Sequence, residues 1–260
     1  MGMGGILRKL NSVQKNYYEN LKNELCKAGL LGSAIAQYYT DHGRGHSERI
    51  VENFNRIIPK NLRLNSTEAY ILLCSAWLHD IATAFQEPGK TPAEIYKTHH
   101  IRGKEFIEKD HALNNLLLSS ARPYIAMITE KHRREESIDK LPESVFIGED
   151  RVRIQLLTAL LRLADGFDIT EARASELRSA FVKELPDEAK IHWGVCRLIT
   201  GWNFNHSKHI IKISAHYETD EEKAMLIWKI DDLYSELSSV ILTLNENGLI
   251  CIGLEAKLVN

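Results

Sequence analysis

The segment Ser75-Ala-Trp-Leu-His-Asp-Ile81 ends the most apolar helix that the sequence predicts, over residues 66–83. The middle of this helix, Ala-Tyr-Ile-Leu-Leu-Cys-Ser-Ala-Trp-Leu, is apolar on every face. A helix that is apolar all round is buried in the core of a protein. The pattern therefore predicts that His79 and Asp80 come at the buried end of a central helix.

A second helix of the same kind is expected over residues 151–168. It contains Leu-Leu-Thr-Ala-Leu-Leu-Arg-Leu-Ala and then reaches Asp165. Burying a carboxylate costs several kcal/mol unless the carboxylate is paired or binds a metal. A helix end that reaches solvent would explain any one of these polar residues. For the His79-Asp80 pair and Asp165 taken together, one shared buried partner is the better interpretation.

Histidines supply further candidate ligands. The chain has 11 of them, and most lie between His42 and His132. His46 opens a helix expected to end before Pro59, His99 lies on a helix expected over 92–109, and His132 lies near the end of a helix expected over 123–134. Imidazole and carboxylate ligands together suit Mn, Fe, Co, Ni or Zn better than Ca.

These residues resemble a known family. His46, the His79-Asp80 pair and Asp165 match the H…HD…D signature of the HD-domain metal-dependent phosphohydrolase superfamily, and the segments around them resemble its motifs over residues 38–175. The resemblance implies a mainly α fold, a helical bundle that holds a metal site.

His99 and His132 resemble the two additional histidines of the binuclear members of this superfamily. His99 precedes Gly103 by four residues, as the corresponding histidine does there. The resemblance implies two divalent ions per chain (Mn, Fe, Ni, Co or Mg), with Asp80 bridging them. The predicted ligands are His46, His79, Asp80, His99, His132 and Asp165. Many relatives carry Gly and then Lys or His after the His-Asp pair; Ala82 and Thr83 stand here, which leaves the proton donor and the phosphate-binding cation open.

Asp80, Arg162 and Lys131 are the candidate catalytic residues. Arg162 interrupts an apolar helix one turn before Asp165, and Lys131 precedes His132. Cations at these places could stabilise the charge that develops on a phosphate during cleavage. The alternative for Arg162 is an ion pair with Asp165 or Asp168. The alternative for Lys131 is a solvated face, because Glu135 and Glu136 follow.

The end of the chain has a different character, and Pro186 marks the expected boundary between a helical domain (1–185) and a small α/β subdomain (186–260). Residues 191–204 and 209–218 read as a β-hairpin, residues 221–246 as a long helix, and residues 249–259 as a final strand. Further helices are expected over 8–28, 111–121 and 170–181. Trp193, Trp202 and Phe204 of the hairpin favour core packing over stacking on a nucleobase.

Composition bounds the function. The chain has 260 residues and a net charge of −2, which argues against a dedicated nucleic-acid binder. A chain of this size buries roughly 75% of its unfolded surface, so a metal is not needed for folding alone. The four cysteines are scattered, and neither a leader peptide nor a membrane-spanning run is evident. We therefore expect a cytoplasmic protein that does not bind membranes, with homo-oligomers left open.

The leading functional hypothesis is hydrolysis of a phosphoester or phosphoanhydride in a nucleotide or related small phosphate. The first alternative is a di-iron oxygenase, since some relatives with six such ligands activate oxygen. The second is a regulatory protein that binds a nucleotide without cleaving it. Retention of all the ligands argues against the second alternative.

Overall fold

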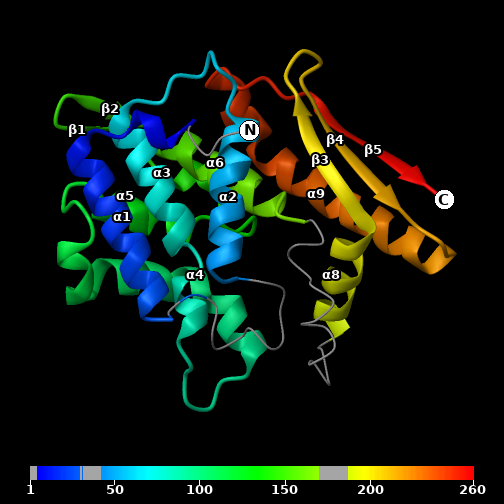
Figure 1. Ribbon diagram of the computed structural model, residues 1–260, viewed down its shortest axis with the longest axis horizontal. Helices are drawn as coiled ribbons and strands as arrows, with labels where there is room; N and C mark the ends of the chain where they lie inside the picture. The colour runs from blue at the N-terminus through cyan, green and yellow to red at the C-terminus, as the bar shows by residue number, and fades with distance from the viewer. Residues whose placement is uncertain (1–4, 30, 32–41, 170–186) are drawn as a thin grey trace.

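The computed structural model describes residues 5–29, 31, 42–169 and 187–260. Figure 1 shows a bundle of helices with a small sheet beside it, formed by the end of the chain. The predicted class, mainly α with a small C-terminal α/β appendage, is confirmed. In the part of the chain that the structure describes, no helix is both long and apolar enough to cross a membrane.

The bundle is built from helices joined by short 3₁₀ turns and one small hairpin. Its α-helices are α1 (Ser12–Lys27), α2 (Arg44–Ile57), α3 (Ser66–Leu78), α4 (Pro92–Lys109), α5 (Arg122–Glu130) and α6 (Ile154–Gly166). The 3₁₀ turns are η1 (Leu7–Lys9), η2 (Ile81–Ala84), η3 (His111–Asn115) and η4 (Ile138–Lys140), and the hairpin is β1 (Val145–Ile147) with β2 (Asp150–Val152). The appendage comprises α8 (Asp187–Leu198), β3 (Ile199–Asn205), β4 (Ile210–His216), α9 (Asp220–Glu246) and β5 (Gly253–Val259).

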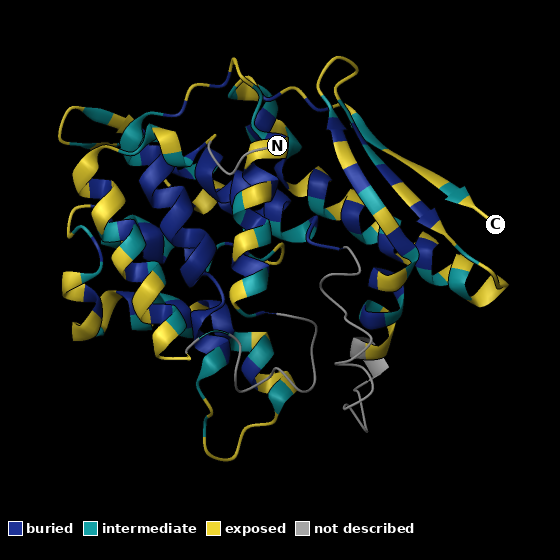
Figure 2. Ribbon diagram, in the orientation of Figure 1, coloured by how far each residue is buried: buried dark blue, intermediate teal, exposed yellow. Residues whose placement is uncertain are grey.

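Helix α3 is the centre of the bundle, as its composition predicts. Every residue from Glu68 to Leu78 is buried, and α1, α2, α5 and α6 pack around it. Figure 2 shows it as a continuous buried segment enclosed by helices with exposed outer faces. A capping box starts this helix: Asn65 Oδ1 accepts from the Glu68 amide at 2.8 Å, and Glu68 Oε2 accepts from the Asn65 amide at 3.0 Å. The central helix thus has a defined start at Ser66.

Several helix predictions need correction, and α1 begins at Ser12 and α5 ends at Glu130, where the sequence predicted residues 8 and 134. The helix expected to reach residue 83 stops at Leu78, and η2 follows, where Thr83 Oγ1 donates to the Asp80 carbonyl. The segment 111–121 forms only the turn η3, because the Asp110 side chain accepts from the Ala112 amide and starts a short 3₁₀ turn. Before α6, residues 150–152 belong to the hairpin. The helix expected over 170–181 lies outside the described residues.

The first strand of the expected hairpin is shorter than predicted, because residues up to Leu198 are helical. In α8, Trp193 and Cys196 lie three residues apart and are both buried, as is Val195. This is a helical spacing, and α8 packs against α9. A Cβ at Gly194 would lie 3.5 Å from Met225 Sδ of α9, so the two helices are in close contact there. Tertiary packing therefore overrides the β-forming composition of this segment.

The appendage sheet has the order β3-β4-β5. Strands β3 and β4 pair antiparallel around the expected turn, and β5 returns parallel to β4 after α9. Along α9 a stripe is buried, made of Leu226, Leu233, Leu237, Val240 and Leu244. Helix α9 contacts β5, and it also packs along α6 of the bundle. Helix α9 thereby lies beside α6, the helix that carries Asp165. The domain boundary near residue 186 stays a prediction.

Candidate metal centre

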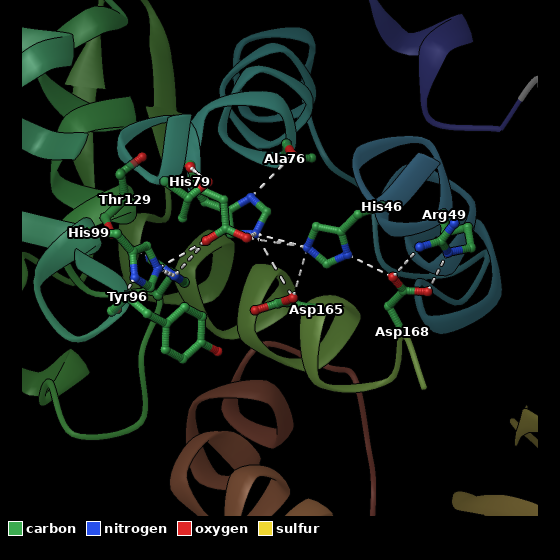
Figure 3. Close-up of polar contacts among 12 residues, drawn as sticks. His46, Arg49, Ala76, His79, Tyr96, His99, Thr129, Asp165 and Asp168 are labelled. Atoms are coloured by element: carbon green, nitrogen blue, oxygen red, sulfur yellow. Dashed lines mark hydrogen bonds and ion pairs between the residues drawn. The ribbon is translucent and has the colours of Figure 1, made fainter. Parts of the chain in front are cut away.

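The six predicted ligands, which are spread over more than a hundred residues of sequence, come together at one end of the central helix. The helix ends and loops involved belong to α2, α3, α4, α5 and α6 (Figure 3). His46, His79, His99, His132 and Asp80 are buried, and Asp165 is partly exposed. The structure therefore brings the six side chains together, and their role as metal ligands stays a prediction.

The first group of donor atoms comes from α2, α3 and α6. His46 Nε2 lies 3.2 Å from His79 Nε2 and 3.2 Å from Asp165 Oδ1. Asp80 Oδ2 lies 3.2 Å from His79 Nε2 and 3.6 Å from His46 Nε2. Bonds of about 2.0–2.1 Å to a tetrahedral ion place neighbouring ligand atoms about 3.3 Å apart. These four side chains therefore fit a transition-metal ion.

The second group uses the other oxygen of Asp80. Asp80 Oδ1 lies 3.0 Å from His99 Nε2 and 3.6 Å from His132 Nε2, and the two Nε2 atoms are 3.0 Å apart. Each oxygen of Asp80 thus faces a different set of imidazoles. A carboxylate in this position can bridge two ions, as the resemblance implies.

Burial and charge set the protonation states that metal binding needs. Burial, together with the neighbouring His99 and His79, holds the pKa of His132 well below its usual range, so this imidazole is neutral with a free lone pair. Burial alone would raise the pKa of Asp80. The adjacent His79 and His99 outweigh it and hold the pKa of Asp80 well below its usual range. Both are the forms that bind metal.

Hydrogen bonds to the Nδ1 atoms orient the histidine rings. Nδ1 of His79, His99 and His132 lies within hydrogen-bonding distance of the carbonyl three residues earlier, on Ala76, Tyr96 and Thr129 respectively. An Nδ1–H that donates to such a carbonyl leaves Nε2 with its lone pair. In all three histidines, Nε2 is the atom that faces Asp80.

Asp168 and Arg49 support the fourth histidine, and the sequence analysis missed this role. His46 Nδ1 lies 2.6 Å from Asp168 Oδ2, and Asp168 is almost fully buried. Arg49 donates two hydrogen bonds to the same carboxylate, from Nε to Oδ1 at 2.7 Å and from Nη2 to Oδ2 at 3.0 Å. A signal was present: Asp168 follows Asp165 by three residues and Arg49 follows His46 by three, the spacing of one helical turn.

We expect Asp168→Asn to weaken binding of the first ion about 10- to 100-fold, because the His46 ring loses the partner that fixes its tautomer and orientation. Metal titration of chelator-treated protein, followed by calorimetry, measures this. Asp231→Asn, on the exposed side of α9, is the matched control. Equal affinities in Asp168→Asn and the wild type would contradict the role assigned to Asp168.

Arg162 contacts the protein backbone in place of the predicted phosphate. Its side chain is buried, Nε donates to the Lys131 carbonyl at 2.8 Å, and Nη2 donates to the carbonyls of Arg133 and Glu136. Helix α5 ends at Glu130, so His132 lies in the loop that these bonds hold. The geometry favours a role for Arg162 in positioning His132. Its main contacts are these backbone carbonyls, and not the alternative ion pair with Asp165 or Asp168.

Arg162→Ala is expected to destabilise the protein by about 3 kcal/mol, since it leaves buried carbonyls without donors. For a chain of this size, that lowers the Tm on the order of 5–10 °C. Loss of the second ion should accompany the change, because His132 is no longer held in place. Thermal denaturation and metal analysis test both effects. An unchanged Tm together with a fall in kcat alone would instead support the hypothesis that Arg162 contacts the phosphate directly.

Lys131 is engaged in ion pairs. Its Nζ lies 2.6 Å from Glu136 Oε2 and 3.3 Å from Glu130 Oε1, and the side chain is mostly buried. The two arginines that follow, Arg133 and Arg134, line the cavity above the ligands, whereas Lys131 is not part of its lining. The cations that line the cavity are therefore Arg133 and Arg134, which follow the predicted Lys131 by two and three residues.

That cavity has a volume of about 230 Å³ and is lined by four of the six predicted ligands. Asp80, His99, His132 and Asp165 form its floor. Its walls include residues of the segment after α5 and residues of α8 and α9. The α9 residues Lys229, Asp232 and Glu236 belong to these walls and were not predicted. Burial raises the pKa of Glu236 to about 7.

A helical bundle that brings a histidine, a His-Asp pair and a distant aspartate together in this order is an HD domain. The HD-CE family model matches residues 36–241, and the chain belongs to the HD-CE family. A comparison with curated proteins finds no match. Membership of an HD-related family suggests a metal-dependent hydrolase, and the buried His/Asp clusters are able to hold metal ions.

Proposed function

We propose that the protein is a metal-dependent phosphohydrolase that cleaves a phosphoester or phosphoanhydride of a small molecule such as a nucleotide. One observation carries the proposal: the two oxygens of Asp80 face separate sets of imidazoles, 3.0–3.6 Å away, on the floor of a cavity. When bound there, two divalent ions would lower the pKa of water toward about 7 and draw charge from a phosphate oxygen.

The protein's own residues hold this chemistry in place. His46, His79, Asp80 and Asp165 would hold one ion, and His99, His132 and Asp80 the other. Arg133 and Arg134 bring positive charge to the cavity wall, where an anionic substrate would lie. The Arg133 guanidinium lies over the Tyr96 ring, and Arg134 donates a hydrogen bond to Asp232. Both side chains are therefore held in place before substrate binds.

The size of the cavity limits the substrate. Pockets for small molecules usually measure about 300–1,000 Å³, and this one lies just below that range at about 230 Å³. A space of this size supports a single small phosphate and not a polymer. The net charge of −2 supports the same choice against nucleic acid.

The test is a panel of nucleotides and other phosphate esters assayed for phosphate release with Mn, Co, Ni and Mg, with metal analysis of the protein as purified. We expect metal-dependent release that a chelator abolishes. The assay is run with and without oxygen. Oxygen consumption with substrate, without phosphate release, would replace the proposal with the oxygenase alternative. Nucleotide binding without turnover would replace it with the regulatory one.

A further inference from the structure

Helix α9 presents one polar face to the cavity. Lys229, Asp232 and Glu236 are three and four residues apart, so they lie on one side of the helix, and all three line the cavity. The buried apolar stripe of the same helix packs into the core. Part of the active-site wall therefore comes from the end of the chain, beyond the ligands themselves.

Glu236 differs from the other two charged residues of this face. Lys229 Nζ lies 2.8 Å from Asp232 Oδ2, and Arg134 Nη1 donates to Asp232 Oδ1 at 2.9 Å. By contrast, Glu236 Oε1 is buried and has no hydrogen-bond partner among the described residues. A buried carboxylate oxygen without a donor is unfavourable, because it has lost its hydrogen bonds to water. Such a group is expected to have a partner that the free protein does not supply.

The packing of α9 on α6 places this carboxylate beside the ligands. Gly166 follows Asp165 directly, and a Cβ at Gly166 would lie 3.3 Å from Glu236 Cγ. The glycine thus leaves room for the Glu236 side chain at the end of α6. The terminal torsion of a glutamate is soft, so the carboxyl group can turn toward a donor in the cavity with little strain.

We propose that Glu236 binds the substrate by accepting a hydrogen bond from a hydroxyl group of the part attached to the phosphate, and so selects phosphates of sugars, ribosides or polyols. The inference rests on the proposed function. A carboxylate repels the phosphate itself, and Arg133 and Arg134 of the same cavity offer the phosphate positive charge, so we place the hydroxyl-bearing part beside Glu236. An uncharged donor is the group that satisfies Glu236.

The test measures binding to the metal-loaded protein by calorimetry, with two non-hydrolysable probes. One is the phosphonate analogue of a ribosyl 5′-phosphate, which carries hydroxyl groups; the other is methylphosphonate, which carries none. The wild type is expected to prefer the ribosyl probe, and Glu236→Leu should lower that preference roughly 10- to 100-fold, as for a hydrogen bond to a charged group. Glu236→Gln should keep part of it, since the amide oxygen still accepts. Asp231→Asn, an exposed change on the same helix, should behave as the wild type.

Two results would overturn the inference. The first is a wild type without preference, or a preference that Glu236→Leu leaves intact. The second is an equal loss of affinity for both probes in Glu236→Leu together with a lower Tm. That result would show that the residue only holds α9 against α6. Because the readout is binding, a wild type that prefers the ribosyl probe and never releases phosphate overturns the proposed hydrolysis and leaves the contact with Glu236 standing.

Discussion

Asp80→Ala is expected to remove bound metal and hydrolysis together. Asp80 supplies an oxygen to each group of imidazoles, at 3.0 Å from His99 Nε2 and 3.2 Å from His79 Nε2. No other carboxylate among the described residues is placed to bridge the two groups. We expect well under one ion per chain and a fall in kcat/KM of at least about a thousandfold, given the several kcal/mol that metal ions supply in such reactions.

The protein should stay folded in this variant, because Asp80 lies outside the apolar core at the end of α3. Elemental analysis gives the metal content, and the Tm of metal-free Asp80→Ala is compared with that of the metal-free wild type. Asp80→Asn keeps one ligating oxygen and should retain part of the metal. Two ions per chain and full activity in Asp80→Ala would overturn the metal centre as a whole.

His99→Ala and His100→Ala should differ sharply although the residues are neighbours. His99 Nε2 lies 3.0 Å from both Asp80 Oδ1 and His132 Nε2, inside the second group. Neighbours on a helix point about 100° apart, so His100 faces elsewhere. Its Nε2 lies 3.7 Å from Glu136 Oε1. We expect about one ion per chain and activity lowered on the order of a hundredfold in His99→Ala, against two ions and activity within a few-fold in His100→Ala.

Metal analysis and steady-state kinetics of the two variants provide the measurement, with His100→Ala as the matched control. A single ion in the wild type that survives in His99→Ala would show the centre to be mononuclear. The phosphohydrolase proposal would then continue with one ion, and the oxygenase alternative would lose its basis.

Features that depend on residues close together in the chain could be predicted from the sequence. The apolar composition of α3 and α6 predicted their burial, and the capping boxes Asn65–Glu68 and Thr91–Glu94 are local features of the same kind, at the starts of α3 and α4. The order of His46, the His-Asp pair and Asp165 indicated the class of site. The apolar pattern can be read from spacing within a few turns of a helix, whereas the order of the ligands was interpreted through the resemblance to a known family.

Only the tertiary structure decided which groups complete the site. Arg162 hydrogen-bonds to carbonyls 26–31 residues away, and Asp168 contacts His46 across 122 residues. Glu236 comes to the cavity because α9 packs on α6 next to Gly166, and the same helix makes α8 helical where its composition favours a strand. Contacts between distant segments depend on how whole elements pack together, which the spacing of residues within one element does not determine.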